Sequence, residues 1–224
     1  MRGDIFASEN IATYPTQPGM SLQGRHSIKY AVNGEVLARQ GAMVAYRGNL
    51  KFEVKSQGVG RFIQRAVTGE GLPLMSVQGQ GEVWFADLAK NCFIISLDPG
   101  DQLSINAKHV LCFDTSLQYD IQMVQGAGIV GGGGLFNSVF SGQGNLGIVC
   151  DGAPIAIPVE PNAPVFVDRD AIVGWSANLQ TSIVKSQSVR SMIRGGSGEV
   201  FQLALNGQGI ALVQPSEGPK FPGS

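Results

Sequence analysis

The chain has 224 residues, of which 31 are glycine and only 15% are charged, and its formal net charge is −1. Many glycines and few charges disfavour a helical protein and favour turns, bulges and closely crossing strands. A net charge near zero gives no overall attraction to nucleic acid or to anionic membranes.

The first 24 residues are expected to form an N-terminal arm outside the folded domain. Its first ten residues, MRGDIFASEN, carry charges where a secretory signal peptide needs an apolar core. No apolar run approaches the roughly 20 residues that a membrane-spanning helix requires. The three cysteines form no CxxC motif, which is typical of reduced thiols. We therefore expect a soluble, cytoplasmic protein.

Three segments share one pattern, in which a strand-like stretch ends on an aromatic residue. They read VLARQGAMVAY (36–46), LSINAKHVLCF (103–113) and VFVDRDAIVGW (165–175). Each segment is followed by a strand with strict two-residue alternation, which is typical of a strand with one buried face. These strands begin at Leu50, Leu117 and Leu179.

A glycine-spaced hairpin closes each copy of the pattern. The three hairpins read GEGLPLMSVQGQG (69–81), GGGLFNSVFSGQG (132–144) and GSGEVFQLALNGQG (196–209). Paired glycines allow bulges or sharp bends where side chains would collide. The pattern predicts one triplicated all-β domain over 25–214, followed by a flexible tail at 215–224. Its lobes are about 25–92, 93–155 and 156–214, joined edge to edge so that apolar faces are buried.

The triple repeat, the turn before each strand and the GxG…GQG hairpins resemble the bacterial relatives of the altered-inheritance-of-mitochondria family. The resemblance covers about residues 24–214. It implies double-stranded β-helix-like sheets in three repeats about a pseudo-threefold axis, related in fold to the tryptophan RNA-binding attenuation protein. It implies no catalytic residues, and the mitochondrial members are associated with inner-membrane organisation.

Aromatic residues end the three repeated stretches. The segments 42–46 and 171–175 are almost continuously apolar or small, so we expect both to be covered on both faces. Tyr46, Phe113 and Trp175 are then core residues around the pseudo-threefold axis rather than stacking platforms for bases or sugars.

The titratable residues form no constellation that recurs in the three copies. His109 aligns with Ala42 and Ala171, so the repeat cannot build a ring of three histidines. The chain has no G-x-S-x-G motif and no P-loop. We therefore expect no enzyme activity, metal, cofactor or small-molecule substrate. A ligand binder or enzyme of the cupin kind is the least favoured alternative, because cupin metal sites need clustered histidines.

Two features remain as candidate contact sites. Arginine pairs at i and i+4 lie in the first and third copies, near Lys55 and Lys185: Arg61 and Arg65, and Arg190 and Arg194. They are either snorkelling residues of a capping turn or a contact for an anionic partner, a membrane surface or another subunit. The second feature is an apolar hairpin at Leu135, Phe136 and Phe140.

These observations favour a non-enzymatic scaffold or interaction protein. We expect it to act as a homo-oligomer or with a protein partner. The alternative is nucleic-acid or anionic-surface binding through the paired arginines, which would have to weaken steeply with salt.

Overall fold

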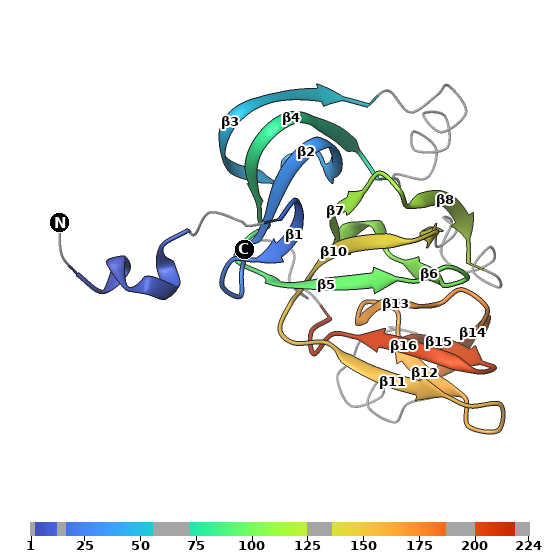
Figure 1. Ribbon diagram of the computed structural model, residues 1–224. Coiled ribbons are helices and arrows are strands. Elements are labelled where there is room, and N and C mark those ends of the chain that lie inside the picture. Colours follow the sequence, from blue (N-terminus) through green and yellow to red (C-terminus); the bar gives the residue numbers. More distant parts are fainter. Residues whose placement is uncertain (1–2, 13–16, 56–71, 125–135, 187–199, 218–224) are drawn as a thin grey trace.

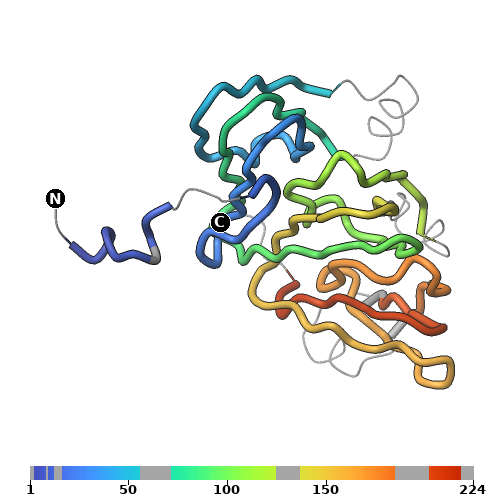
Figure 2. Tube along the Cα trace, in the orientation of Figure 1, coloured from blue at the N-terminus to red at the C-terminus, as the bar shows by residue number. Residues whose placement is uncertain are grey.

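The computed structural model is all-β (Figure 1). It describes residues 3–12, 17–55, 72–124, 136–186 and 200–217. Within these ranges it contains sixteen strands and three single-turn 3-10 helices. Two of the helices, η1 (Asp4–Phe6) and η2 (Ser8–Asn10), lie in an N-terminal segment that extends away from the sheets (Figure 2). No helix in the described part of the chain has the length and apolar character needed to cross a bilayer.

The largest sheet has seven strands, all paired antiparallel. Three of them are twelve residues long: β2 (Ile28–Arg39), β3 (Met43–Val54) and β4 (Leu74–Phe85). The order β3-β4-β2 continues through three shorter strands: β7 (Val110–Asp114), β10 (Gly144–Cys150) and β5 (Asn91–Leu97). The short β1 (Gly19–Leu22) pairs with β2 beside this path.

The remaining strands form a six-stranded and a three-stranded sheet. The first, in the order β11-β16-β13-β6-β9-β8, contains β11 (Ile155–Val159), β16 (Gly209–Val213), β13 (Ile172–Ser176), β6 (Gln102–Ile105), β9 (Phe136–Ser141) and β8 (Gln118–Met123). The second, in the order β12-β15-β14, contains β12 (Val165–Asp168), β15 (Val200–Asn206) and β14 (Gln180–Ser186). The third 3-10 helix, η3 (Ala107–His109), leads directly into β7.

One arrangement of strand partners occurs at three places along the chain. β10 pairs with β5 and β7, β16 pairs with β11 and β13, and the second half of β4 pairs with the first halves of β2 and β3. Likewise β9 pairs with β6 and β8, β15 pairs with β12 and β14, and the first half of β4 pairs with the second halves of β2 and β3. The arrangement around β4 therefore consists of three long strands, whereas each of the other two arrangements consists of six short strands.

Glycines of the first Gly-Gln-Gly hairpin lie where β4 crosses β3 at very short range. A Cβ atom on Gly81 would lie 2.2 Å from the carbonyl oxygen of Arg47, and one on Gly79 would lie 2.2 Å from that of Asn49. Real Cβ atoms do not approach backbone oxygens so closely. The two glycines therefore set the distance between these strands.

We expect Gly81→Ala to lower the free energy of unfolding by about 2 kcal/mol, because the methyl group must push β3 away from β4. Chemical denaturation of the variant measures this loss. The matched control is Gln80→Ala, since Gln80 is the exposed residue between the two glycines and should change stability by less than about 0.5 kcal/mol. Equal stability of the two variants would contradict the close crossing.

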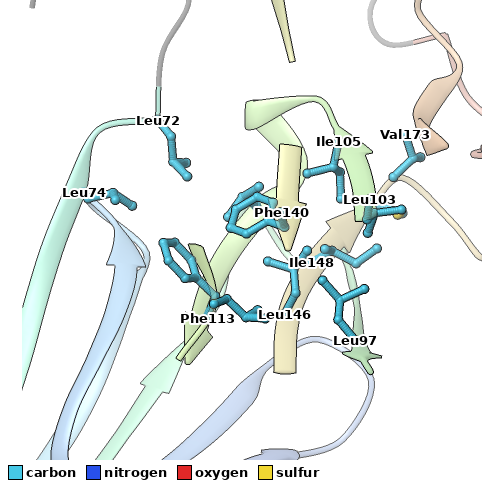
Figure 3. Packing of buried hydrophobic residues seen from close by; sticks show 13 residues of the cluster. Leu72, Leu74, Leu97, Leu103, Ile105, Phe113, Phe140, Leu146, Ile148 and Val173 are labelled. Carbon is cyan, nitrogen blue, oxygen red and sulfur yellow. The ribbon is translucent and has the colours of Figure 1, made fainter. Parts of the chain in front are cut away.

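The central hydrophobic cluster gathers buried side chains from several strands (Figure 3). Phe113 and Phe140 are fully buried, and their ring centroids lie 5.0 Å apart in an edge-to-face arrangement. Tyr119 completes the group at 5.6 Å from Phe113. Edge-to-face packing of this kind adds to the stabilisation that burial alone provides.

The repeated aromatics are not all core residues. Phe113 and Trp175 are buried, as the sequence predicts. Tyr46 is 52% exposed, and Val44 beside it is 60% exposed, so the prediction that 42–46 is covered on both faces is wrong. The physical reason is that β3 is the end strand of its sheet, and no strand in the described ranges lies on its outer side.

Candidate functional site

The predicted contact residues fall into three groups. The four arginines, Arg61, Arg65, Arg190 and Arg194, lie outside the described residues, as does Leu135. Phe136 lies in β9 and Lys185 in β14, but their side chains are outside what the structure describes. Phe140 is fully buried. The proposed apolar contact at Phe140 is therefore wrong, because its ring fills the interior between Phe113 and Tyr119.

Lys55 is held in an ion pair. Its ammonium group lies 2.8 Å from Oε1 of Glu35, and the side chains of Ser76 and Gln78 donate hydrogen bonds to the same oxygen. These donors, with Lys55 the strongest, lower the pKa of Glu35 to about 2. Both groups stay charged at neutral pH, so this cluster fixes the end of β3 and is no proton donor or acceptor.

A cleft of about 600 Å³ lies between the β5–β6 turn and strands β13 and β16. Its apolar lining consists of Ile95, Leu97, Leu103, Ile210 and Leu212, together with Gly100. Five polar residues also line it: Ser96, Asp101, Gln102, Ser176 and Asn178. The cleft was not predicted from the sequence, in which Pro99, Gly100 and Asp101 indicate a turn at its rim and nothing more.

Several polar groups of the cleft have hydrogen-bond partners within the fold. Ser96 donates a hydrogen bond to Oδ1 of Asn145 at 2.8 Å, and Ser176 accepts one from the amide of Ile210 at 3.0 Å. The carboxylate of Asp101 accepts the amide of Asp98 at 3.0 Å within the turn. No histidine or cysteine lines the cleft as described.

A buried ionic cluster joins the first three long strands. Lys29 and Glu82 are each 5% exposed, and Nζ of Lys29 lies 3.7 Å from Oε1 of Glu82. Arg47, opposite Glu82 in the strand register, donates from Nε to Oε2 of Glu82, and its guanidinium group lies over the ring of Trp84. The arrangement stabilises the packing of β2, β3 and β4, and both oxygens of the carboxylate face cations rather than a substrate space.

A second polar network crosses from β2 to β10. Tyr30 donates a hydrogen bond to Oδ1 of Asp114 at 2.7 Å, and Oδ2 of Asp114 accepts from the backbone and side-chain nitrogens of Asn145. Burial and the neighbouring carboxylate raise the pKa of Tyr30 far above its usual value. Tyr30 therefore stays protonated, and the network serves as a structural link between strands.

His109 is buried in η3, not in a strand. Its Nδ1 lies 2.8 Å from the carbonyl oxygen of Val149, to which it donates, and Nε2 has no hydrogen-bond partner in the structure as described. Burial lowers the pKa of His109 from 6.5 to about 4. The imidazole is therefore neutral at physiological pH.

This shift predicts a pH dependence of stability. The unfolded chain binds the proton of His109 more tightly than the folded chain, so the free energy of unfolding should fall as the pH drops below 6.5. We expect a loss of about 2 kcal/mol from this residue between about pH 7.5 and pH 5.

Denaturation at both pH values should show this loss, and His109→Asn should remove it, because an amide can still donate to Val149 without titrating. An unchanged pH dependence in His109→Asn would contradict the assignment.

The three cysteines, Cys92, Cys112 and Cys150, are free and buried. Burial raises the pKa of Cys92 to about 11 and that of Cys150 to about 12, and it raises that of Cys112 as well. Thiols with raised pKa values are poor nucleophiles and poor metal ligands. Among the residues that the structure places, no three His, Cys, Asp or Glu side chains lie together as a metal site would need.

The remaining feature is the exposed apolar side chains on two of the end strands of the described sheets. β3 ends the seven-stranded sheet, and β12 ends the three-stranded sheet. Val44, Tyr46 and Phe166 are all more than half exposed on these strands. Exposed apolar side chains on an unpaired edge are typical of a contact surface. The sequence analysis missed them because the same apolar pattern also describes a fully buried strand.

Comparisons with known proteins agree with the fold. The family described as mitochondrial biogenesis AIM24 matches residues 26–216. No curated protein matches the chain. Seven chains of solved structures match, among them the X-ray crystal structure of a Streptococcus pyogenes protein. The two are 22% identical, with a TM-score of 0.67 over 89% of this chain and 93% of that one. The chain thus shares the fold of this solved structure, and it belongs to the AIM24 family.

Proposed function

We propose that the protein is a non-enzymatic β scaffold that acts by association, as a homo-oligomer or in complex with a protein partner. The observation that carries the proposal is the exposure of Val44, Tyr46 and Phe166 on two unpaired strand edges. The titratable groups described above are, in contrast, held in structural hydrogen bonds and ion pairs. The proposal places the protein in the cytoplasm, where its three free thiols remain reduced.

The proposal includes triplication. One sheet unit is repeated three times, in a double-stranded β-helix-like arrangement related to that of the tryptophan RNA-binding attenuation protein. The predicted pseudo-threefold axis would require β12 to pair with β3 as β2 pairs with β7, and these two strands are apart in the described chain. Its support is the arrangement of strand partners, which is the same around β4, around β9 and β10, and around β15 and β16. A repeated sheet unit has edges that need partners, which is the physical basis for association.

Native mass spectrometry of the protein isolated from its own cells tests the proposal. The expected mass is a multiple of the 23.6 kDa chain, or that of a stable complex with another polypeptide. A single 23.6 kDa species at micromolar concentration, with no second polypeptide, would contradict it. A species that retains a stoichiometric small molecule would instead favour the ligand-binding alternative, for which the 600 Å³ cleft is the place.

Binding of nucleic acid or an anionic surface through Arg61, Arg65, Arg190 and Arg194 is the second candidate, and it is supported by their spacing in the sequence alone. Lys55, which is near the first pair in the sequence, forms an ion pair with Glu35. Titration with a labelled RNA or with anionic vesicles at two salt concentrations decides the matter. Affinity that falls steeply with salt and is lost in the four Arg→Ala substitutions would support this candidate over the scaffold.

A further inference from the structure

Two junctions between strand groups follow one register. At the first, β2 pairs with β7, and at the second, β6 pairs with β13, both antiparallel. In each junction the aromatic that ends one repeated stretch lies opposite the second residue of another, and the residue before the aromatic lies opposite the third. At the first junction Phe113 lies opposite Leu37, and Cys112 lies opposite Ala38. At the second, Trp175 lies opposite Ser104, and Gly174 lies opposite Ile105.

In the described chain, two strands of the repeated stretches have a paired strand on one side only. The counterpart of β7 and β13 is the first part of β3, which pairs with β4 alone in the described chain. The counterpart of β2 and β6 is β12, which pairs with β15 alone there. Two of the three junctions that the register allows are therefore formed, and the components of the third are both present.

Burial distinguishes the formed junctions from the missing one. Tyr46 is 52% exposed, whereas its counterparts Phe113 and Trp175 are 0% and 3% exposed. Val44 is 60% exposed, whereas its counterparts Leu111 and Val173 are fully buried. Val44 and Tyr46 are therefore apolar side chains of the kind that the formed junctions bury, but no strand of the described chain covers them.

The central residues of both edges lack the features that normally prevent pairing. The stretches 43–46 and 165–167 contain no charged residue and no proline, the usual protections of an exposed strand edge, which here lie only at their borders, in Arg47, Pro164 and Asp168. β3 has a bulge between Met43 and Ala45, but β13 has one at the aligned place, between Ile172 and Gly174, and still pairs with β6. The bulge therefore does not exclude a partner strand.

The two edges belong to opposite ends of the described structure. In Figure 1 the strands β2, β3 and β4 form one end of the stack of sheets, and β12 lies at the other end beyond β5, β6 and β13. The formed junctions, β2 with β7 and β6 with β13, hold these ends apart. Within the described chain β12 therefore does not reach β3, and its place beside β3 is open to a strand from another molecule.

We propose that β12 of one chain pairs antiparallel with the first part of β3 of a second copy, with Phe166 opposite Tyr46 and Val167 opposite Ala45. This inference rests on the proposed function and names its partner and its surface. Because the two edges differ, the contact is head-to-tail, and each added copy presents a new free edge until the assembly closes into a ring or continues as a filament.

Variants with one added cysteine test this register, since the three native cysteines are buried. Paired residues of adjacent antiparallel strands are close enough for a disulfide, so a mixture of Tyr46→Cys and Phe166→Cys chains should form a disulfide-linked dimer under mild oxidation. The matched control mixes Tyr46→Cys with Ile155→Cys, since Ile155 is 58% exposed on β11, an end strand of another sheet. We expect at least a tenfold higher dimer yield from the first mixture.

The double variant separates the remaining outcomes. Tyr46→Cys with Phe166→Cys in one chain should give disulfide-linked multimers whose yield rises with concentration. A cross-link within one chain, independent of concentration, would mean that the chain closes on itself and would overturn the inference. An oligomer with no cross-link in either test would also overturn it while leaving the proposed function intact. A lone chain without any partner would overturn both.

A second, non-covalent test uses charge. Phe166→Asp should reduce the mass measured by light scattering to that of the single 23.6 kDa chain, because a carboxylate would be buried against the edge of β3. Ile155→Asp is the control, and its mass should equal that of the unsubstituted protein. An unchanged assembly in Phe166→Asp would contradict the pairing.

Discussion

Replacing Glu82 by Gln should lower the free energy of unfolding by about 3 to 4 kcal/mol. Lys29 is 5% exposed, and its ammonium group has Glu82 as its ion-pair partner, which Arg47 shares. Removing the carboxylate's charge takes this ion pair from the Lys29 ammonium group in a poorly solvated interior, which costs far more than the loss of a surface ion pair. Denaturation in urea at neutral pH measures the change.

The control for this prediction is Glu53→Gln on the neighbouring long strand β3. Glu53 is exposed, so the substitution should change stability by less than about 0.5 kcal/mol. A double substitution of Lys29→Met with Glu82→Gln should cost less than the sum of the two single changes, because the charges depend on one another. Additive costs, or a loss in Glu82→Gln as small as that in Glu53→Gln, would show that the cluster is solvated.

Phe113→Ala should lower the free energy of unfolding by about 4 kcal/mol. Its ring is fully buried, packs edge-to-face against both Phe140 and Tyr119, and lies opposite Leu37 at the junction of β7 with β2. Truncation removes these contacts and leaves a cavity that the strands around it cannot fill. Thermal or chemical denaturation at low protein concentration gives the loss.

The aligned aromatic of the first repeat provides a matched comparison. Tyr46→Ala should cost about 1 kcal/mol or less in the dissociated chain, since its side chain is half exposed and keeps only an edge-to-face contact with Phe52. Equal losses from Phe113→Ala and Tyr46→Ala would mean that Tyr46 is covered as well. That result would contradict the unpaired edge on which the proposed assembly depends.

Much of the fold follows from sequence periodicity. Strict alternation places Leu117 and Leu179 in the core and leaves Gln118 and Gln180 exposed, because side chains of a strand point to opposite faces in turn. The all-β class follows in the same way from the glycine-rich turns. A period of two residues identifies the buried face of a strand, and the structure confirms that face at these positions.

The edges could not be predicted from the same pattern. The segments 42–46 and 171–175 are equally apolar, yet β13 is covered on both sides by β16 and β6, whereas β3 has β4 on one side alone in the described structure. Whether a strand has a second neighbour depends on which distant strand lies beside it in the fold, and local periodicity does not encode that. The candidate site lies at those positions, so the sequence alone did not identify it.

Phe140 illustrates the opposite error. In the sequence it belongs to a glycine-rich hairpin with other apolar residues, and such hairpins are commonly exposed. In the structure β9 pairs with both β6 and β8, which covers the strand on two sides, and the Phe140 ring packs against Phe113 and Tyr119. Long-range strand pairing thus decided its burial, and the hairpin pattern did not.

Hydrogen exchange of the backbone amides in 43–46 and 165–168, followed as a function of protein concentration, tests the central claim most directly. For the amides of these segments that point away from β4 and β15, the account predicts fast exchange in dilute solution and protection in both segments together as the chains associate. The amides of β13 should remain protected throughout. Exchange rates in these two segments that stay the same while the particle mass increases would contradict it.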